Sequence, residues 1–394
     1  MSPTPAAARP DGDECDVLVV GGGPAGSTAA ALLARQGRKV VLVEKVHHPR
    51  FHIGESLLPA NVQLFDQLGL RSELERIGQR KWGIEFVSTE HAHSSFLEFA
   101  DAWDKTMPYA WHVRRSVLDE ILFHHAGVSG AQTLEGCKVT QVDFDADGAS
   151  AHASMDDGTA RRWRARYLLD ATGRDTLLAA KFGLKQKSDA HGSAAIFGHF
   201  RGAQRLPGKL EGNISIFWFA HGWLWLIPLA DGSTSIGAVC WPYYLKTRDK
   251  PLREFFADTI ALAPALQQRL RDATLIDDMV YATGNYSYSS TRACGQRHAL
   301  LGDAFAFIDP VFSSGLYFAM RNAFDAAELV AAELDHPERA AAARRRYEAL
   351  MQKGPREFSW FIYRMSNPAM RELFMQPKNP LRVKEALLSL LAGD

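Results

Sequence analysis

Three glycines near the start of the chain have the spacing that binds a phosphate group. Gly21, Gly23 and Gly26 form a G-x-G-x-x-G sequence, with Pro24 and Ala25 between the last two. Such glycines make a tight turn, let the backbone approach a diphosphate, and let a helix pack closely on a strand. The diphosphate would bind the N–H groups at the helix start, where the helix dipole favours negative charge.

The elements around these glycines are those of a dinucleotide-binding unit. An apolar strand covers 16–20, a helix with Ala/Leu periodicity covers 27–35, and a second strand covers 39–43. Glu44 ends the second strand and can accept hydrogen bonds from a ribose diol, and Lys45 follows it at the same cofactor edge. A glycine turn that binds no ligand is the alternative.

Two later strand ends indicate a long ligand. YLLDATG places Asp170 and Gly173 after one apolar strand, and HALLGD places Asp303 after another. A helix then begins in a turn that contains Pro310, Ser313, Ser314 and Gly315, where backbone N–H groups could meet an electron-rich ring edge or an anion. Three separate strand ends that face a nucleotide suit FAD better than NAD.

Composition sets limits on the class of protein. The 394 residues contain 45 Lys+Arg and 45 Asp+Glu, so the charge balance favours neither nucleic acid nor an anionic membrane as a partner. The four cysteines form no C-x-x-C pair, which argues against a zinc site or a disulfide framework and fits a reducing cytoplasm, and we expect no metal site. We also expect no signal peptide and no integral membrane segment.

The pattern predicts an α/β fold with an inserted antiparallel sheet. Residues 14–180 and 286–335 would form a discontinuous Rossmann-like FAD-binding domain, and Asp147-Gly148 and Asp157-Gly158 predict hairpin turns within it. Residues 181–285 alternate apolar and polar side chains and would form an antiparallel substrate-binding sheet. Residues 336–394 would be a C-terminal helical segment.

Several longer motifs resemble one family of flavoproteins. They are RFHIGESLLP at Arg50–Pro59, GQRKWGIEF at Gly78–Phe86, VRRSVLD at Val113–Asp119, GWLWLIP at Gly222–Pro228 and FIDPVFSSG at Phe307–Gly315. Together with GGGPAG, DATG and GD, these motifs resemble the flavin-dependent halogenases of the phenol and pyrrole type. This family shares the p-hydroxybenzoate hydroxylase-like fold with FAD-dependent monooxygenases and geranylgeranyl reductases. The resemblance covers roughly residues 14–335.

The resemblance implies roles for specific residues. Arg50, Ser56 and Arg115 would lie at FAD, with Leu118 in place of the family's usual Phe. FADH2 and oxygen would give a C4a-hydroperoxide, and chloride held by the backbone near Ser314 and Gly315 would attack it to release hypochlorous acid. The acid would cross a channel to Lys81, beside an electron-rich phenol- or pyrrole-like substrate that is free or tethered to an acyl or peptidyl carrier protein. A separate flavin reductase would supply FADH2.

Trp223 and Trp225 lie two residues apart in a predicted strand, so both indoles project from one face. The resemblance implies that they form a wall between flavin and substrate. Other interpretations stay open: the indoles could be core, Lys81 a solvated cation, and Arg115 a surface charge. A monooxygenase or a geranylgeranyl-reductase-like oxidoreductase is the alternative function.

Overall fold

Five parallel strands form the centre of the first domain. The computed structural model describes residues 13–103, 108–187, 192–284, 287–365, 367–375, 379 and 382–392. The parallel strands run in the order β20 (His298–Leu300), β10 (Ala160–Asp170), β1 (Asp13–Val20), β2 (Val40–Val43) and β7 (Gln132–Leu134). β19 (Cys294–Gly295) pairs with β20 in antiparallel fashion. The apolar stretches at 17–20 and 40–43 are buried on both faces, as parallel strands require.

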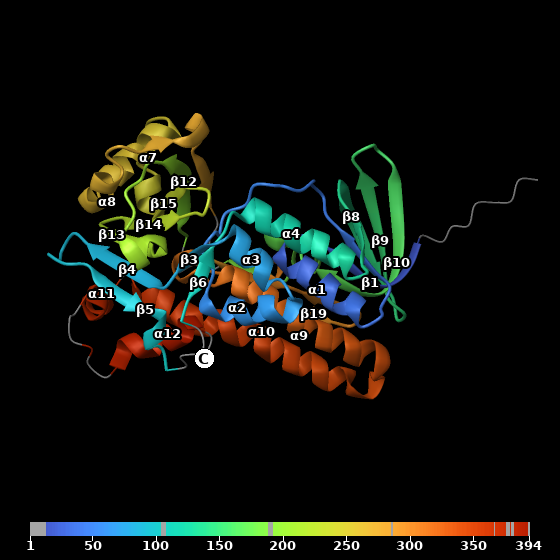
Figure 1. The fold of residues 1–394 in the computed structure, drawn as a ribbon. Coiled ribbons are helices and arrows are strands. Elements are labelled where there is room, and N and C mark those ends of the chain that lie inside the picture. The colour runs from blue at the N-terminus through green and yellow to red at the C-terminus, as the bar shows by residue number, and fades with distance from the viewer. Residues whose placement is uncertain are drawn as a thin grey trace, which may run out of the picture.

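A layer of helices packs beside this sheet (Figure 1). α1 (Pro24–Arg35) follows the glycine motif and packs against α4 (Arg115–Val128) and the long α9 (Gly315–Asp335). α2 (Pro59–Leu68) and α3 (Arg71–Ile77) lie beside them. The predicted Rossmann-like unit of strand, helix and strand is therefore confirmed.

A long hairpin extends from the sheet at the end away from the second domain (Figure 1). β8 (Cys137–Phe144) pairs with β9 (Ala149–Met155), which pairs in turn with the first half of β10. The Asp-Gly pairs at 147–148 and 157–158 lie at the two reversals, so both predicted turns are confirmed. The last half of β10 then enters the parallel sheet and ends at Asp170.

The second domain is a mainly antiparallel sheet. Its order is β16 (Thr274–Leu275), β12 (Ala194–Arg201), β15 (Thr234–Cys240), β14 (Gly222–Pro228), β13 (Ile214–Phe219), β4 (Gly83–Ser88) and β5 (Ser95–Glu98), and β17 (Tyr281–Thr283) pairs with β12. The β13–β4 pair is parallel. Helices α6 (Pro242–Leu245), α7 (Leu252–Ala261) and α8 (Pro264–Arg269) follow β15 along the chain.

The chain contributes to this sheet twice, which differs from the predicted division. β4 and β5 come from within 14–180, the range assigned to the FAD-binding domain. The apolar and polar pattern within one strand could not predict that β4 and β5 belong to the second sheet, because the parallel pairing of β4 with β13 joins residues about 130 positions apart. The predicted boundary at 285–286 lies outside the described residues, and the remaining division stays a prediction.

A small three-part ribbon joins the two domains. β3 (Gln79–Lys81) pairs with β6 (Ala110–His112), and Ser56 forms an isolated antiparallel bridge with His112 on the other edge of β6. A separate three-stranded sheet contains β11 (Lys185–Lys187), β18 (Tyr288–Ser290) and β21 (Ala306–Phe307). The ribbon places residues from three distant segments at one point.

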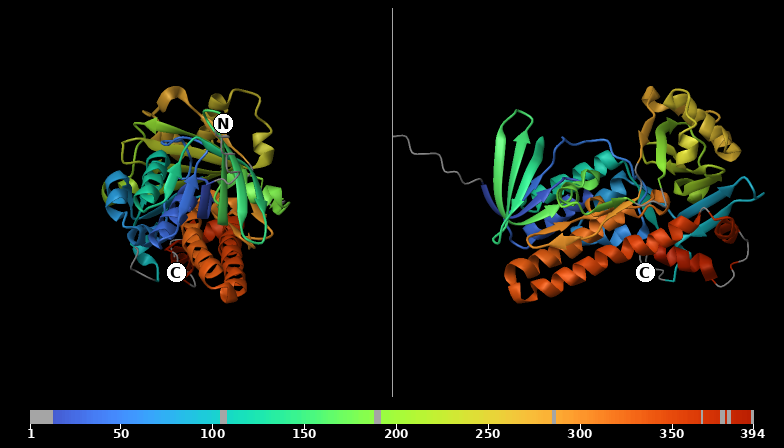
Figure 2. Two further views of the ribbon diagram at one scale, coloured as in Figure 1. Left: turned by 90° about the vertical axis from the view of Figure 1, so that its right-hand side faces the viewer. Right: turned by 180° about the vertical axis from the view of Figure 1, so that it is seen from behind.

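The C-terminal helices cross from the first domain to the second (Figures 1 and 2). α10 (Pro337–Met365) runs beside α9, and α11 (Pro368–Met375) and α12 (Val383–Ala392) reach the second sheet. Their apolar side chains share one buried cluster with Trp218, Trp223 and Trp225. Among the described residues, we find no helix with the length and apolar character needed to span a membrane.

The two faces of β14 contact different layers. Trp223 and Trp225 face the cluster that contains the C-terminal helices, whereas Leu224 and Leu226 face α7 and α8. The alternation confirms the predicted strand. Gly237 lies opposite Trp225 on β15, and a Cβ at Gly237 would lie 2.1 Å from the indole.

We predict that Gly237→Ala destabilises the fold by about 1–3 kcal/mol, because the added methyl group must displace the Trp225 indole within a packed core. Thermal and chemical unfolding measure the change. Gly127→Ala is the matched control, since Gly127 lies within α4 and a Cβ there meets Thr133 at ordinary contact distances of 3.5 and 3.7 Å. The control should be neutral or slightly stabilising. Equal stability of the two variants would contradict the proposed packing.

Candidate functional site: a cofactor cradle and a buried lysine

The glycine motif forms an open cradle at the start of α1. Gly21 has a φ of +108°, and a Cβ there would lie 2.2 Å from the Ala171 carbonyl oxygen. A Cβ at Gly26 would lie 1.9 Å from the Gly21 carbonyl oxygen, so both positions require glycine. A Cβ at Gly23 would meet only the Arg50 guanidinium, at 3.3 Å. In the part of the chain that the structure describes, no side chain caps the helix start beside Pro24 and Ala25, so its N–H groups are available for an anion.

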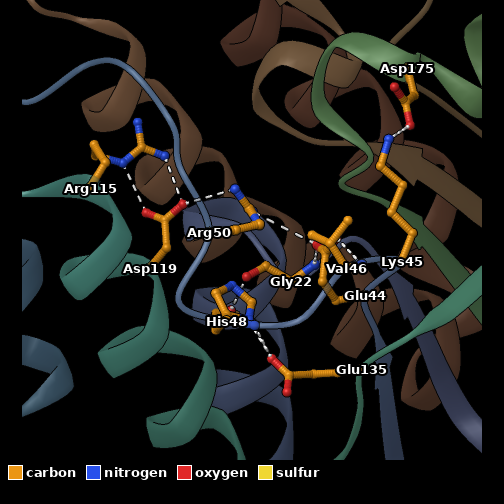
Figure 3. A network of polar contacts seen from close by, with 11 residues as sticks. Gly22, Glu44, Lys45, Val46, His48, Arg50, Arg115, Asp119, Glu135 and Asp175 are labelled. Atoms are coloured by element: carbon orange, nitrogen blue, oxygen red, sulfur yellow. Dashed lines mark hydrogen bonds and ion pairs between the residues drawn. The ribbon is translucent and has the colours of Figure 1, made fainter. Parts of the chain in front are cut away.

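A chain of charged groups surrounds this cradle (Figure 3). Glu44 accepts hydrogen bonds from the N–H groups of Gly22, at 2.7 Å, and Val46, at 3.2 Å. Arg50 lies between two carboxylates: its Nη2 is 3.8 Å from Glu44 and its Nη1 is 3.4 Å from Asp119. The buried Nε of Arg50 has no hydrogen-bond partner among the described residues. Arg50 therefore has an unused donor beside Gly23.

Arg115 holds this cradle together from α4. Its Nε and Nη2 donate to Asp119 at 2.8 and 3.0 Å (Figure 3). Its Nη1 donates to the Ile53 carbonyl at 2.9 Å. Burial alone would raise the pKa of Asp119, but the charge and hydrogen bonds of Arg115 lower it overall. Arg115 is thus a buried partner of Asp119 rather than a surface charge, and its contact with FAD stays a prediction.

Lys45 and the end of β10 also form contacts within the protein. Lys45 pairs with Asp175 (Figure 3). Asp170 accepts hydrogen bonds from the N–H and hydroxyl of Thr172 and from the N–H of Leu178, at 3.0, 2.6 and 2.7 Å. Asp170 therefore orders the loop that contains Gly173, which is a local role that the sequence motif alone did not indicate. An added Cβ at Gly173 would meet nothing within 4 Å, so this loop leaves space.

The start of α9 presents further unused donors. Asp309 accepts from the Val311 N–H at 3.1 Å, Pro310 begins the short turn 310–312, and Ser313 has a φ of +58°. The buried hydroxyl of Ser314 has no partner among the described residues, and a Cβ at Gly315 would meet nothing within 4 Å. Desolvation raises the pKa of the nearby Asp303 to about 6.

These features fit FAD. The cradle at Gly23 and Arg50 suits a diphosphate, Glu44 suits a ribose, and the open start of α9 suits the oxygen-rich edge of a flavin ring. Among the described residues there is no group of three or more His, Cys, Asp or Glu that could hold a metal ion.

Lys81 lies apart from this cradle, in the ribbon between the domains. Its side chain is only 1% exposed, and its Nζ donates to the Ser56 hydroxyl at 2.7 Å. The Nζ also lies 5.4 Å from the centre of the Phe99 ring. Desolvation lowers the pKa of Lys81 from 10.5 to about 7. Lys81 is therefore not a solvated cation, and Ser56, predicted to lie at the cofactor, holds the lysine.

The two indoles of β14 are buried and anchored differently. Trp225 donates from Nε1 to the Ser235 hydroxyl at 3.1 Å. Burial raises the pKa of Asp309 to about 6. The Trp223 indole is close enough to donate a hydrogen bond to this carboxylate, and that interaction opposes the rise. The Ser193 hydroxyl donates to the same carboxylate at 3.0 Å. Trp223 and Trp225 share their apolar cluster with Phe99, which lies beside Lys81, and with Phe312, which lies just before α9.

Comparison with known proteins identifies the family. A family model described as an FAD binding domain matches residues 14–349. The flavin-dependent halogenase rdc2 of Metacordyceps chlamydosporia is 36% identical over 81% of this chain and 65% of its own length. The chain belongs to the flavin-dependent halogenase family. It spans 65% of the length of rdc2.

Two further comparisons cover most of both chains. A 1H-pyrrole-2-carbonyl-[peptidyl-carrier protein] chlorinase of Pseudomonas fluorescens is 27% identical over 96% of this chain and 89% of its own length. The crystal structure of a flavoprotein/dehydrogenase from Cytophaga hutchinsonii superposes with a TM-score of 0.88 at 28% identity, and the match covers 97% of this chain and 93% of the other.

As a member of this family, the chain uses FAD as its cofactor. Sequence reasoning missed three residues that the structure brings to the site: Ser193, His112 and Asp309. The motif FIDPVF contained a signal for Asp309, since an acid before Pro310 can cap the turn that follows. Ser193 and His112 carried no local signal, because Ser193 reaches the site through its bond to the distant Asp309 and His112 through the pairing of β6 with β3.

We predict that Arg50→Gln weakens FAD binding by about 10- to 100-fold, because a charged donor beside the diphosphate contributes about 1.5–3 kcal/mol. Quenching of flavin fluorescence measures the affinity. Arg346→Gln, an exposed arginine on α10, is the control and should leave FAD affinity unchanged. An unchanged affinity in Arg50→Gln would show that Arg50 does not bind the cofactor.

The buried ammonium group of Lys81 also predicts how stability depends on pH. In the unfolded chain Lys81 keeps its proton up to about pH 10.5, whereas in the folded protein it loses the proton near pH 7. The unfolded state therefore binds more protons between these values, so this group makes the free energy of unfolding rise with pH by up to about 1.4 kcal/mol per pH unit. The loss of stability caused by burying the charged ammonium group is therefore fully present below pH 7.

Lys81→Met removes this dependence, so the stability advantage of the Met variant over the wild type should be largest near pH 7 and shrink toward pH 10. Urea unfolding of both proteins at several pH values gives the difference. A difference that does not change with pH would mean that the Lys81 pKa is the same in the folded and unfolded states.

Proposed function

We propose that this protein is an FADH2- and oxygen-dependent halogenase that chlorinates an electron-rich aromatic substrate. The single observation that carries the proposal is Lys81: a fully buried lysine, hydrogen-bonded to Ser56, with its pKa lowered to about 7. A lysine buried at this cost in a ribbon between domains needs a chemical reason. Membership of the halogenase family supports the same interpretation.

The oxidant would form at the cofactor cradle, where FAD and chloride would bind. Gly21, Gly23 and Gly26 with Arg50 would bind the diphosphate of FAD, and Glu44 would bind the ribose. Chloride would bind the N–H groups at Ser314 and Gly315, where the start of α9 has open space and an unpartnered hydroxyl. When bound and reduced, FAD with oxygen supplies the oxidising power that turns chloride into hypochlorous acid.

Lys81 would direct this acid to the substrate. Its ammonium group can donate a hydrogen bond to the oxygen of hypochlorous acid, and its neutral amine can instead take the chlorine to form a chloramine. A pKa of about 7 makes both protonation states available near neutral pH. Since the shift comes from desolvation, the same apolar surroundings that lower the pKa also exclude competing water.

The two indoles would separate the oxidant from the substrate. Trp223 and Trp225 fill the apolar cluster that contains both Phe99, beside Lys81, and Phe312, beside the start of α9. A substrate kept on the lysine side cannot approach the flavin and be hydroxylated there. The bond from Trp223 to Asp309 would also hold the chloride-binding turn in place.

The substrate and partners follow from this chemistry. Hypochlorous acid attacks electron-rich rings, so we propose a phenol or pyrrole, either free or tethered to a carrier protein. The similar Pseudomonas fluorescens enzyme carries the name of a chlorinase of a carrier-bound pyrrole, which supports the tethered form. A separate flavin reductase would supply FADH2 in the cytoplasm.

A second candidate is a flavoenzyme without halogenation, either a monooxygenase or a reductase. The observation that favours it is the close structural match to a protein described as a flavoprotein/dehydrogenase. This candidate gives no role to the ammonium of Lys81, and its substrate would have to reach the flavin ring.

The test is turnover with photoreduced FAD, oxygen, chloride and a panel of phenols and of pyrroles, free and carrier-bound. We expect chlorinated products from the wild type and none from Lys81→Met, which should still bind FAD and consume oxygen. Lys138→Met, an exposed lysine on β8, is the control and should chlorinate normally. Mass spectrometry detects the chlorine isotope pattern.

Hydroxylated or hydrogenated products without chlorine would overturn the proposal and favour the second candidate. Chlorination that survives in Lys81→Met would keep the halogenase assignment but remove Lys81 from it.

A further inference from the structure

His112 is a second buried titratable residue at the Lys81 site, and no role described above uses it. Its side chain is 0% exposed and lies at the end of β6. Neither ring nitrogen meets hydrogen-bond geometry with any described residue, although the Gly212 carbonyl is close enough to act on its pKa. Because the Gly212 carbonyl can accept from one ring N–H, at least one nitrogen of this buried imidazole is left unused, which is rare unless something else binds to it.

Backbone pairing places His112 on the same face of the ribbon as Lys81. His112 is paired with Gln79 on β3 and with Ser56 on the other edge. Residues directly opposite in an antiparallel pair point to the same face, and so do residues two apart in one strand. Lys81, two residues after Gln79, therefore shares its face with His112 and Ser56. The bond from Lys81 to the Ser56 hydroxyl confirms this geometry.

His112 is neutral and so can accept a proton. Burial and the nearby positive charge of Lys81 hold the pKa of His112 well below its usual value. Other charges that act on it are few: Arg205 lowers its pKa further, and no carboxylate raises it. Glu55, the nearest acid in sequence to Ser56, is bonded to His199 at 3.0 and 3.1 Å. Among the described residues, His112 is therefore the available base beside Lys81.

We propose that His112 accepts the proton that the aromatic ring loses when it is chlorinated, and returns that proton to Lys81. This inference rests on the halogenase function proposed above. Chlorination of a ring carbon by hypochlorous acid must remove one proton from that carbon, and a neutral imidazole in a dry site is suited to take it.

The atoms and electrons of this sequence balance. The O–Cl bond of hypochlorous acid breaks as chlorine bonds to the ring carbon, and the oxygen leaves as water with a proton from the Lys81 ammonium. The ring carbon then loses its proton to a nitrogen of His112, and the C–H electron pair returns to the ring. Transfer of this proton from His112 to the Lys81 amine restores the ammonium and the neutral imidazole.

The first test is the isotope effect for a substrate deuterated at the chlorinated position. In the wild type, loss of the ring proton should be fast and the isotope effect near one. In His112→Asn, proton loss should become limiting, so chlorination slows by about 100-fold and the isotope effect rises clearly above one. His152→Asn, an exposed histidine on β9, is the control and should behave as the wild type.

A merely structural role for His112 would lower the rate without changing the isotope effect, and that outcome would overturn the proposal. Equal rates in His112→Asn and the wild type would also overturn it while leaving the halogenase function intact. A wild type that yields no chlorinated product would instead refute the proposed function.

A second measurement does not depend on turnover. Nitrogen-15 NMR of the FAD-bound protein reports the protonation of the His112 ring. We expect a neutral ring at pH 6–7 in the wild type and a higher His112 pKa in Lys81→Met, because the charge that depresses it is gone. A ring that is protonated in the wild type, or a pKa that does not respond to Lys81→Met, would contradict proton exchange between the two residues.

Discussion

The ammonium group of Lys81 is taken out of water with the Ser56 hydroxyl, and no carboxylate of the described residues, as its hydrogen-bond partner. Such burial is costly, and the protein reduces the cost by lowering the pKa so that the group can shed its charge. Three segments must meet to build the site: the loop that contains Ser56, β3 with Lys81, and β6 with His112. The ribbon between the two domains is thus organised around the buried Lys81 side chain.

The segment from Arg50 to Ser56 links this ribbon to the cofactor cradle. Arg50 lies beside Gly23, the Ile53 carbonyl is bonded by Arg115, and Ser56 holds Lys81. A segment of seven residues therefore connects the proposed diphosphate site to the proposed halogenating lysine. A second link runs through β14, where Trp223 contacts Asp309 at the turn before α9 while Trp225 fits against Gly237.

Features that depend on neighbouring residues were predictable from sequence. The glycine motif, the strand that ends at Glu44, the Asp-Gly turns and the alternation of Trp223 and Trp225 in β14 each have a local physical cause, and each appears in the structure. The family resemblance, carried by motifs such as FIDPVFSSG, was confirmed by the comparisons.

Features that depend on pairing between distant segments were not predictable. The resemblance of the Arg50–Pro59 motif implies that Ser56 lies at the cofactor, which stays a prediction, but it did not indicate that pairing with β6 also brings Ser56 to Lys81. β4 and β5 belong to the second sheet because β4 pairs with β13 in parallel. The Asp170 carboxylate accepts hydrogen bonds from its own loop. His112 became visible as a candidate base only when the ribbon was assembled.

The central claim is that Lys81 is a buried base whose proton is available near neutral pH. The most direct measurement is the pKa of the Lys81 side chain in the FAD-bound protein, by NMR of nitrogen-15-labelled lysine, with Lys81→Met to assign the signal. We expect a pKa of about 7 for the Lys81 side chain, far below the ordinary lysine pKa of 10.5. A value near 10 would contradict it, because the lysine would then be a permanent cation that is open to water.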